Sequence, residues 1–149
     1  MTCLYLDMNV YNRPFDDQSQ MRIQLETVAI IIIFALIETG VLSARWSFIL
    51  EYENSRNPSF ERKALACYLS QSCDNTVEPD ESIRKLAKQL SETHGVRGRD
   101  ALYLACADLS NCDYLVTCDD RLIRRGQRLR KEGVLRVKVV NPVDLVQEV

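Results

Sequence analysis

Short apolar runs alternate along the chain with longer segments in which apolar residues recur every three or four positions. The short runs predict strands, because a strand buried on both faces of a parallel sheet is continuously apolar. These runs lie at residues 3–6, 41–46, 75–77, 114–117 and 137–140. The periodic segments predict helices at residues 19–39, 47–56, 58–72, 80–94, 99–110, 121–131 and from 142 onward. This alternation predicts an α/β sandwich around a mainly parallel sheet, with residues 114–117 as a central strand.

Several residues mark where these helices begin and end. Ser47 has the short polar side chain preferred at a helix N-cap, and Pro58 suits a first turn because it lacks an N–H. Gly40 and Gly95 stand where helices are expected to stop. His94, the only histidine, then lies at a helix end, where it complements the helix dipole. No serine or cysteine nucleophile has another histidine available, which excludes hydrolysis of the Ser–His type.

Nothing in the sequence divides the chain into parts. It has no internal repeat and no linker rich in Pro, Gly or Ser, so residues 1–149 are expected to form one domain. Its most apolar segment, VAIIIIFALI at residues 28–37, is much shorter than the ~20 residues that span a membrane. We therefore expect a buried helix there and no membrane association.

The cysteines show neither a CxxC spacing nor a preceding secretory signal. This pattern favours buried thiols in the reducing cytoplasm over disulfides or a zinc site of Cys/His type. The six cysteines are Cys3, Cys67, Cys73, Cys106, Cys112 and Cys118.

Positive charge is concentrated in one predicted helix, although the net charge of the chain is −2. That net charge is unlike a general nucleic-acid-binding protein, so contacts with nucleic acid depend on local clusters. The helix at 121–131 supplies a candidate set for binding substrate phosphates, and the alternative is an ordinary solvated face. The set is Arg121, Arg124, Arg125 and Arg128.

Carboxylates follow two of the predicted strands. Asp7 ends the first strand, and Asp119 follows the strand at 114–117. The carboxyl ends of parallel strands meet at one edge of a sheet, so these two side chains should lie close together. Asp100, near the start of its helix, and a glutamate after the second strand would complete a cluster of four. Such hard oxygen ligands suit Mg²⁺ or Mn²⁺, and two such ions can assist hydrolysis of a phosphodiester.

Four segments of the chain resemble the motifs of the PIN-domain family, in the family's order. They are LDMNV at 6–10, SFILEYE at 47–53, RDALYLA at 99–105 and YLVTCDDR at 114–121. Met8 departs from the small Thr or Ser common at its position. The resemblance implies a three-layer α/β/α sandwich, a divalent-metal ribonuclease site and a homodimer. It also implies kinship with the toxins of toxin–antitoxin pairs, and hence a small antitoxin protein as a possible partner.

The resemblance assigns the metal ligands to one acidic residue in each motif. They are Asp7, Glu53, Asp100 and Asp119. The second motif also offers Glu51, about 200° around the helix from Glu53, so only one of the two can face the site. The spacing from Ser47 favours Glu53.

Three polar residues within the motifs are candidates for orienting these ligands: Asn9, Ser47 and Thr117. Asn9 could instead be a turn residue, and the other two could simply end a strand or cap a helix. The additional acids Asp108 and Asp120 are expected on a solvated helix face or at a cap. Weaker candidates for phosphate contacts are Arg13, Arg97 and Arg99.

The sequence therefore predicts a metal-dependent endoribonuclease. A catalytically silent PIN fold that binds RNA or regulates is the main alternative, although all four motifs retain their acids. A small phosphatase with Asp7 as its phosphorylated nucleophile is a third hypothesis, but such enzymes usually have a second Asp at the position of Asn9.

Overall fold

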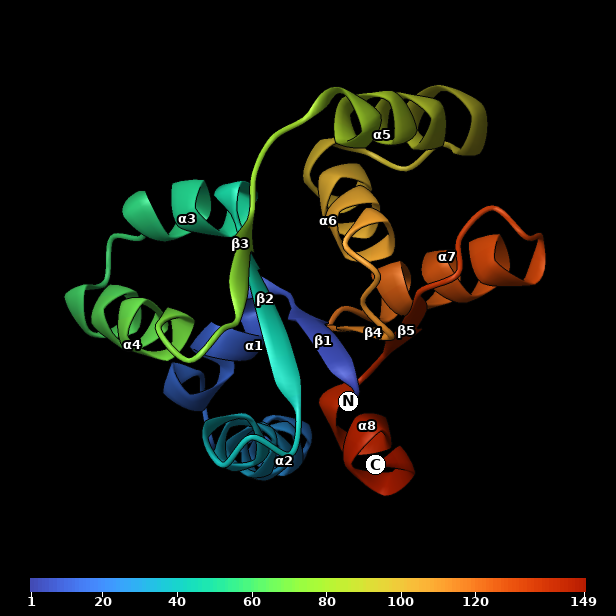
Figure 1. Cartoon of the computed structure of the whole chain (residues 1–149). Helices are drawn as coiled ribbons and strands as arrows, with labels where there is room; N and C mark the ends of the chain where they lie inside the picture. The colour runs from blue at the N-terminus through green and yellow to red at the C-terminus, as the bar shows by residue number, and fades with distance from the viewer.

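A computed structural model describes residues 1–149 as five strands alternating with helices (Figure 1). The strands are β1 (Cys3–Leu6), β2 (Ser43–Ser47), β3 (Asn75–Val77), β4 (Tyr114–Val116) and β5 (Lys138–Val140). They form one sheet in the order β3-β2-β1-β4-β5, and every neighbouring pair is parallel. The predicted α/β class is confirmed, and the sheet is wholly rather than mainly parallel.

The strand order places a crevice between β1 and β4. From β1 in the middle of the sheet the chain moves outward through β2 to β3, then crosses back to β4 and β5. The predicted central strand, β4, is thus next to the middle one. Where the strand order reverses, the connections leave in opposite directions and open a crevice at the carboxyl ends of the strands. Here that point lies beyond the paired residues Leu6 and Val116.

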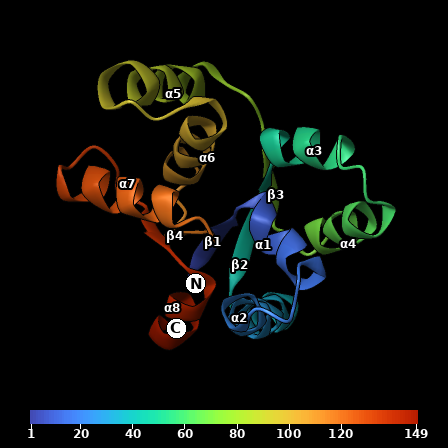
Figure 2. The same ribbon diagram turned by 180° about the vertical axis from the view of Figure 1, so that it is seen from behind.

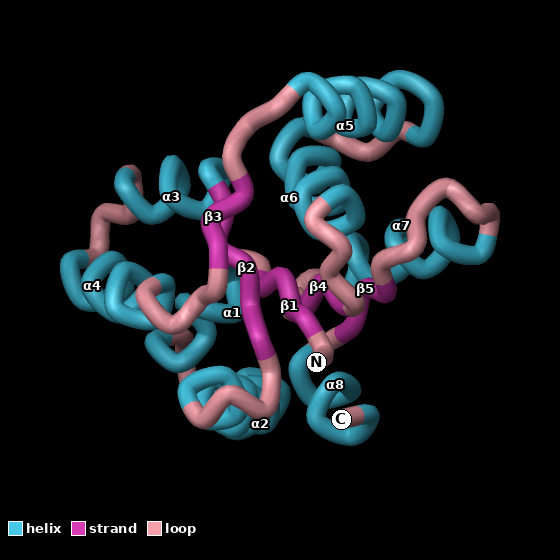
Figure 3. The backbone as a smooth tube through the Cα atoms, in the orientation of Figure 1, coloured by secondary structure: helices cyan, strands magenta, loops and turns pink.

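The helices lie on both faces and at both edges of the sheet (Figures 1 and 2). α2 (Met21–Glu38) and α8 (Pro142–Glu148) pack together on one face, and α5 (Glu81–His94) and α6 (Gly98–Leu109) on the other. α3 (Phe48–Ser55) and α4 (Phe60–Ser70) lie near β3, while α7 (Asp120–Lys131) packs against β5. The tube in Figure 3 shows the resulting three layers, with the strands between the two groups of helices.

A glycine allows α7 to approach β5 closely. A Cβ atom added at Gly126 would lie 2.2 Å from Cγ2 of Val139, a distance that real side chains do not reach. Only a glycine therefore fits this contact without a shift of helix or strand. The contact holds α7 against the sheet, with its N-terminus following the end of β4.

The apolar helix at 28–37 differs from the expectation. It belongs to α2, whose inner side is buried at Ile30 and Ile33. Its outer side exposes large apolar side chains, at Met21, Leu25, Val28, Ile31 and Ile32. The prediction of a buried helix is therefore right for one side and wrong for the other, because one layer of helix covers the sheet here. None of the helices is both long and apolar enough to cross a membrane.

A few element boundaries also differ. α1 (Met8–Asn12) was not predicted, because it is only five residues long and is followed at once by residues typical of loops. Pro58 precedes the helix instead of lying in its first turn, because Ser59 caps α4 through the N–H of Arg62. Gly95 ends α5 in the left-handed conformation, as predicted.

Candidate functional site

A pocket of about 270 Å³ lies at the carboxyl ends of β1 and β4, and all four predicted ligands line it. Asp7 follows β1, Glu53 comes from α3, Asp100 from the first turn of α6, and Asp119 from the N-cap of α7. The complete lining is Asp7, Met8, Asn9, Asn12, Asp16, Glu53, Arg62, Arg99, Asp100 and Asp119. Residues more than a hundred positions apart therefore meet where the strand order reverses.

Asp7 is buried and held by three hydrogen bonds. Its Oδ2 accepts from Oγ1 of Thr117 at 2.8 Å and from Nδ2 of Asn9 at 3.1 Å, and its Oδ1 accepts from the N–H of Asn9 at 3.3 Å. Burial raises the pKa of Asp7 to about 6, and the bonds from Thr117 and Asn9 only partly oppose this shift. The carboxylate is therefore oriented, but its charge is poorly compensated.

Asn9 and Thr117 connect the ends of β1 and β4. Nδ2 of Asn9 donates to Oγ1 of Thr117 at 3.1 Å, and Oδ1 of Asn9 accepts the N–H of Cys118 at 3.1 Å. Oγ1 of Thr117 also accepts the N–H of Asp119 at 3.1 Å. These bonds fix Asp7 relative to Asp119 across the two strands.

Ser47 lies outside the pocket. Its fully buried hydroxyl accepts the N–H of Leu50 at 3.2 Å, which caps α3, and lies 2.6 Å from the hydroxyl of Tyr5. Of its two predicted alternatives, helix capping is what the geometry shows. Ser47 can therefore affect the position of Glu53 only indirectly, by fixing the start of α3.

The structure separates the two glutamates of the second motif. Glu53 lines the pocket, where it accepts a bond from Nη1 of Arg99 at 2.8 Å and another from the hydroxyl of Tyr103. Burial raises its pKa, and Arg99 opposes this. Glu51 is exposed outside the pocket and accepts from the indole N–H of Trp46 at 2.8 Å.

The negative charge of Asp119 acts on Asp100. The pKa of Asp100 is raised, first by burial and then by the negative charge of Asp119. Asp119 caps α7, with its Oδ1 accepting the N–H groups of Arg121 at 2.9 Å and Leu122 at 3.4 Å. The two carboxylates thus line one pocket, and the nearby Arg99, Arg121 and Arg125 only partly oppose the rise in the pKa of Asp100.

The donor atoms of the pocket suit a hard divalent cation. Its lining offers carboxylate and amide oxygens and contains neither histidine nor cysteine, the donor set that Mg²⁺ and Mn²⁺ prefer. As the side chains stand, no group of three or more His, Cys, Asp and Glu is arranged to hold a metal ion. The pairing of Glu53 with Arg99 and Tyr103 is one reason, since it turns this carboxylate to protein donors.

The basic helix divides into two pairs. Arg121 and Arg125, together with Arg97 and Asp100, line a second pocket of about 150 Å³ beside the first. Nη1 of Arg125 also donates to the carbonyl of Gly95 at 2.6 Å. Arg124 and Arg128 are exposed and line neither pocket. Half of the predicted arginine set is therefore adjacent to the carboxylates.

Three further charged residues considered in the sequence form structural contacts away from the acidic pocket. Arg13 pairs with the buried Glu26 at 3.0 Å, which removes it from consideration for phosphate binding. Oδ1 of Asp108 accepts the N–H groups of Arg136 and Val137 at 2.8 and 3.0 Å. Asp120 pairs with Arg22 at 2.7 Å.

Three residues around the pocket were not identified from the sequence. Asp16 and Arg62 line it and form an ion pair at 2.9 Å, but they belong to a loop and a helix outside the motifs. Tyr103 contacts Glu53, and its spacing of three from Asp100 on one helix is a signal that could have found it.

Comparisons with known proteins agree with the four motifs and the sheet. A family model described as the PIN domain matches residues 4–127. VapBC2 from Rickettsia felis, in a crystal structure bound to a DNA fragment from their promoter, contains a similar chain with a TM-score of 0.56 and 13% identity. The match covers 94% of this chain and 98% of that one. None of the curated proteins matches. The family model spans most of the sequence and all four acidic residues, and the chain therefore belongs to the PIN-domain family.

Proposed function

We propose that the chain is a cytoplasmic endoribonuclease that requires Mg²⁺ or Mn²⁺. The observation that supports this most is the meeting of Asp7, Glu53, Asp100 and Asp119 in one pocket at the point where the strand order reverses. Membership of the PIN-domain family supports it independently.

The four carboxylates would hold the metal, with Asp7 as the most rigid of them. A bound divalent ion supplies a water molecule of lowered pKa and compensates charge at the scissile phosphate. Asn9 and Thr117 keep Asp7 in position through the bonds that cross from β1 to β4. Asp119 is fixed by its capping bonds from Arg121 and Leu122, and Arg99 would have to release Glu53 for that carboxylate to join the cluster.

RNA is the proposed substrate, and its phosphates would contact the arginines beside the acidic pocket. Arg97, Arg121 and Arg125 surround Asp100, so a phosphate bound there would stand next to the carboxylates. Arginine binds phosphate strongly because its planar group presents several N–H donors at once. The net charge of −2 makes such a local cluster necessary.

The exposed side of α2 is the proposed contact with a second copy or with a small antitoxin protein. Met21, Leu25, Val28 and Ile32 follow one another at spacings of four, three and four, so they form one apolar stripe on the outside of the helix. Stripes of this kind on a soluble protein mark interaction surfaces. The resemblance to toxins of toxin–antitoxin pairs suggests both kinds of partner.

A cleavage experiment tests the enzymatic part. Single-stranded RNA is incubated with the purified chain in Mn²⁺, in Mg²⁺ or in chelator, and the products are resolved on a gel. We expect cleavage that needs metal, fails in Asp119→Asn and persists in Glu51→Gln. Equal cleavage in chelator would refute the proposal. Binding of RNA without cleavage in either metal would instead support the silent RNA-binding alternative.

A further inference from the structure

Two cysteines face each other at the opposite end of β1 from the acidic pocket. Cys3 is the first residue of β1, and Cys112 lies between α6 and β4. Their Sγ atoms are 3.5 Å apart, and both side chains are buried. The backbone beside them is fixed, because the N–H of Asp113 donates to the carbonyl of Cys3 at 2.8 Å and Oδ2 of Asp113 accepts the N–H of Cys3 at 2.8 Å.

Polar groups surround this pair of thiols. Ser43 is opposite Cys3 in the register of β2, and Arg45 is two residues further on the same face of the sheet. The Nε–H of Arg45 has no hydrogen-bond partner. Oγ of Ser110 lies 3.4 Å from Sγ of Cys112. A negative charge on Cys3 would therefore meet one thiol donor, a hydroxyl and a nearby cation.

The chemistry of Cys3 differs accordingly from that of the other buried thiols. The hydrogen bond with Cys112 lowers the pKa of Cys3, against the effect of burial and with smaller contributions from Ser43 and Arg45, and it raises the pKa of Cys112. Burial raises the pKa of Cys73 to about 11 and that of Cys106 to about 12. Since the thiolate is the reactive form, Cys3 stands apart from these two.

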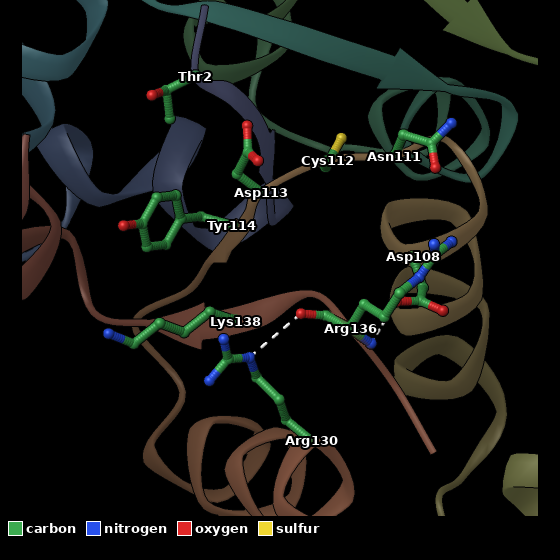
Figure 4. A pocket seen from close by; sticks show the side chains of 9 residues that line it. All are labelled: Thr2, Asp108, Asn111, Cys112, Asp113, Tyr114, Arg130, Arg136 and Lys138. Atoms are coloured by element: carbon green, nitrogen blue, oxygen red, sulfur yellow. Dashed lines mark hydrogen bonds between the residues drawn. The ribbon is translucent and has the colours of Figure 1, made fainter. Parts of the chain in front are cut away.

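A pocket gives small molecules access to the pair. A cavity of about 500 Å³ lies at this end of the sheet, and Cys112 is part of its lining. Figure 4 shows the Cys112 side chain at the edge of this pocket beside Asp113. A small oxidant entering the pocket therefore meets Cys112, whose sulfur atom lies 3.5 Å from that of Cys3.

We propose that Cys3 and Cys112 are a dithiol site that hydroperoxides oxidise to a reversible intramolecular disulfide. The Cys3 thiolate attacks the peroxide oxygen and becomes a sulfenic acid, while the O–O bond breaks and hydroxide, once protonated, leaves as water. The Cys112 sulfur then displaces the hydroxyl of the sulfenic acid, which leaves as a second water. In total two thiols lose two electrons and two protons, and one hydrogen peroxide becomes two waters.

Only a small movement is needed to form this bond. The two sulfur atoms must approach from 3.5 Å to about 2.05 Å. The disulfide would join the start of β1 to the connection before β4, two segments that the hydrogen bonds between Asp113 and Cys3 already hold together. The ligands at the other end of the strands need not move, so this inference is independent of the proposed nuclease activity.

Mass spectrometry of the whole chain tests the proposal. The reduced protein is treated with one equivalent of hydrogen peroxide, the remaining thiols are alkylated under denaturing conditions, and the intact and digested protein are weighed. We expect four of the six thiols to be alkylated, a peptide linking Cys3 to Cys112, and full recovery of the thiols with a reductant. Under denaturing conditions the linked species should have the mass of a single chain at every protein concentration.

Matched variants distinguish oxidation of the Cys3–Cys112 pair from oxidation of a cysteine that is merely exposed. Cys67 is the exposed cysteine, so Cys67→Ser should leave the linked peptide unchanged, whereas Cys112→Ser should abolish it. Arg45→Gln should slow its formation several-fold. The proposal is overturned if wild-type Cys67 is oxidised while Cys3 and Cys112 remain alkylated. This outcome is read from the wild type, so it does not depend on any variant folding.

Discussion

Nη1 of Arg99 lies 2.8 Å from Oε2 of Glu53, so that a cation from the first turn of α6 compensates a carboxylate of α3 inside the acidic pocket. Arg99 is largely exposed, whereas Glu53 is largely buried. The arginine can therefore move into solvent at little cost while the glutamate stays in place. A metal ion and Arg99 would compete for the same carboxylate.

This competition predicts that Arg99→Gln tightens metal binding. Loss of the positive charge frees Glu53 and removes repulsion of the ion, and an ion pair whose arginine is largely exposed is worth about 1 kcal/mol, or roughly fivefold in affinity. Calorimetric titration with Mn²⁺ measures the change. Arg56→Gln is the control, since Arg56 lies over the ring of Tyr52 outside the pocket. Weaker binding in Arg99→Gln would show that the pair does not restrain the site.

The second prediction concerns the ligands themselves. Asp7→Asn, Asp100→Asn and Asp119→Asn should each lower RNA cleavage at least ~100-fold, because ligands that act as a unit fail together. Glu53→Gln should be similarly damaging and Glu51→Gln nearly silent, since only Glu53 lines the pocket. Single-turnover cleavage at saturating metal measures these rates. A near-normal rate in any of the first three variants would remove that residue from the proposed set.

Local patterns in the sequence were sufficient to predict the strands and the acidic residues that follow them. Asp7 and Asp119 each follow an apolar run, and parallel strands bring such positions to one edge. Helical geometry allowed only one of Glu51 and Glu53 to face the site, the spacing from Ser47 in the second motif favoured Glu53, and Glu53 lines the pocket. Each prediction rests on where a residue stands relative to its own strand or helix, and that position can be read from the sequence.

Contacts between elements could not be predicted in the same way. The bonds of Glu53 with Arg99 and Tyr103 depend on how α3 and α6 pack across the end of the sheet. The division of the arginines depends on the rotation of α7, which the contact of Gly126 with Val139 sets. A helical pattern indicates which residues share a face, but not what that face meets.

The third prediction uses this division of the basic helix. Arg121→Gln combined with Arg125→Gln should weaken RNA binding and reduce the slope of log affinity against log salt, by roughly one for each phosphate that is no longer neutralised. Arg124→Gln combined with Arg128→Gln is the matched control with the same change of charge, because these side chains line neither pocket. Binding is measured with catalytically inactive Asp119→Asn as the background. Equal effects of both double variants would mean that RNA affinity depends on the total charge of the helix and not on the position of each arginine.

The fourth prediction concerns the apolar stripe of α2. Val28→Asp combined with Ile32→Asp should dissociate a homodimer that uses this surface, because two buried charges without partners are costly at an interface. Sedimentation equilibrium measures the change. Gln24→Asp, which adds a charge at an exposed polar position of the same helix, is the control. A monomeric wild type would exclude self-association. A dimer that persists in the double variant would mean that the chain self-associates through another surface.

The last prediction tests the acidic cluster through stability, without a substrate. A carboxylate whose folded pKa lies above its unfolded value destabilises the fold once the pH exceeds the unfolded pKa, and the penalty grows until the pH passes the folded value. The pKa of Asp7 rises from an ordinary 3.8 to about 6, which corresponds to about 3 kcal/mol. The contribution of Asp7 to the stability of the metal-free chain should therefore fall as the pH rises from about 4 to about 6 and remain at the lower level above it.

Asp100→Asn should relieve part of this penalty near pH 7. The pKa of Asp100 is raised by burial and by Asp119, and its side chain accepts no hydrogen bond that the change would break. We expect the variant to melt above the wild type in chelator at pH 7 and to lose this advantage near pH 4. Metal at ten times its dissociation constant should stabilise the wild type by about 1.4 kcal/mol and the variant much less. Asp120→Asn is the control of opposite sign, since Arg22 lowers the pKa of Asp120 and removing that carboxylate should not stabilise the fold. If Asp100→Asn melts below the wild type in chelator and metal shifts both equally, the four carboxylates do not share a site.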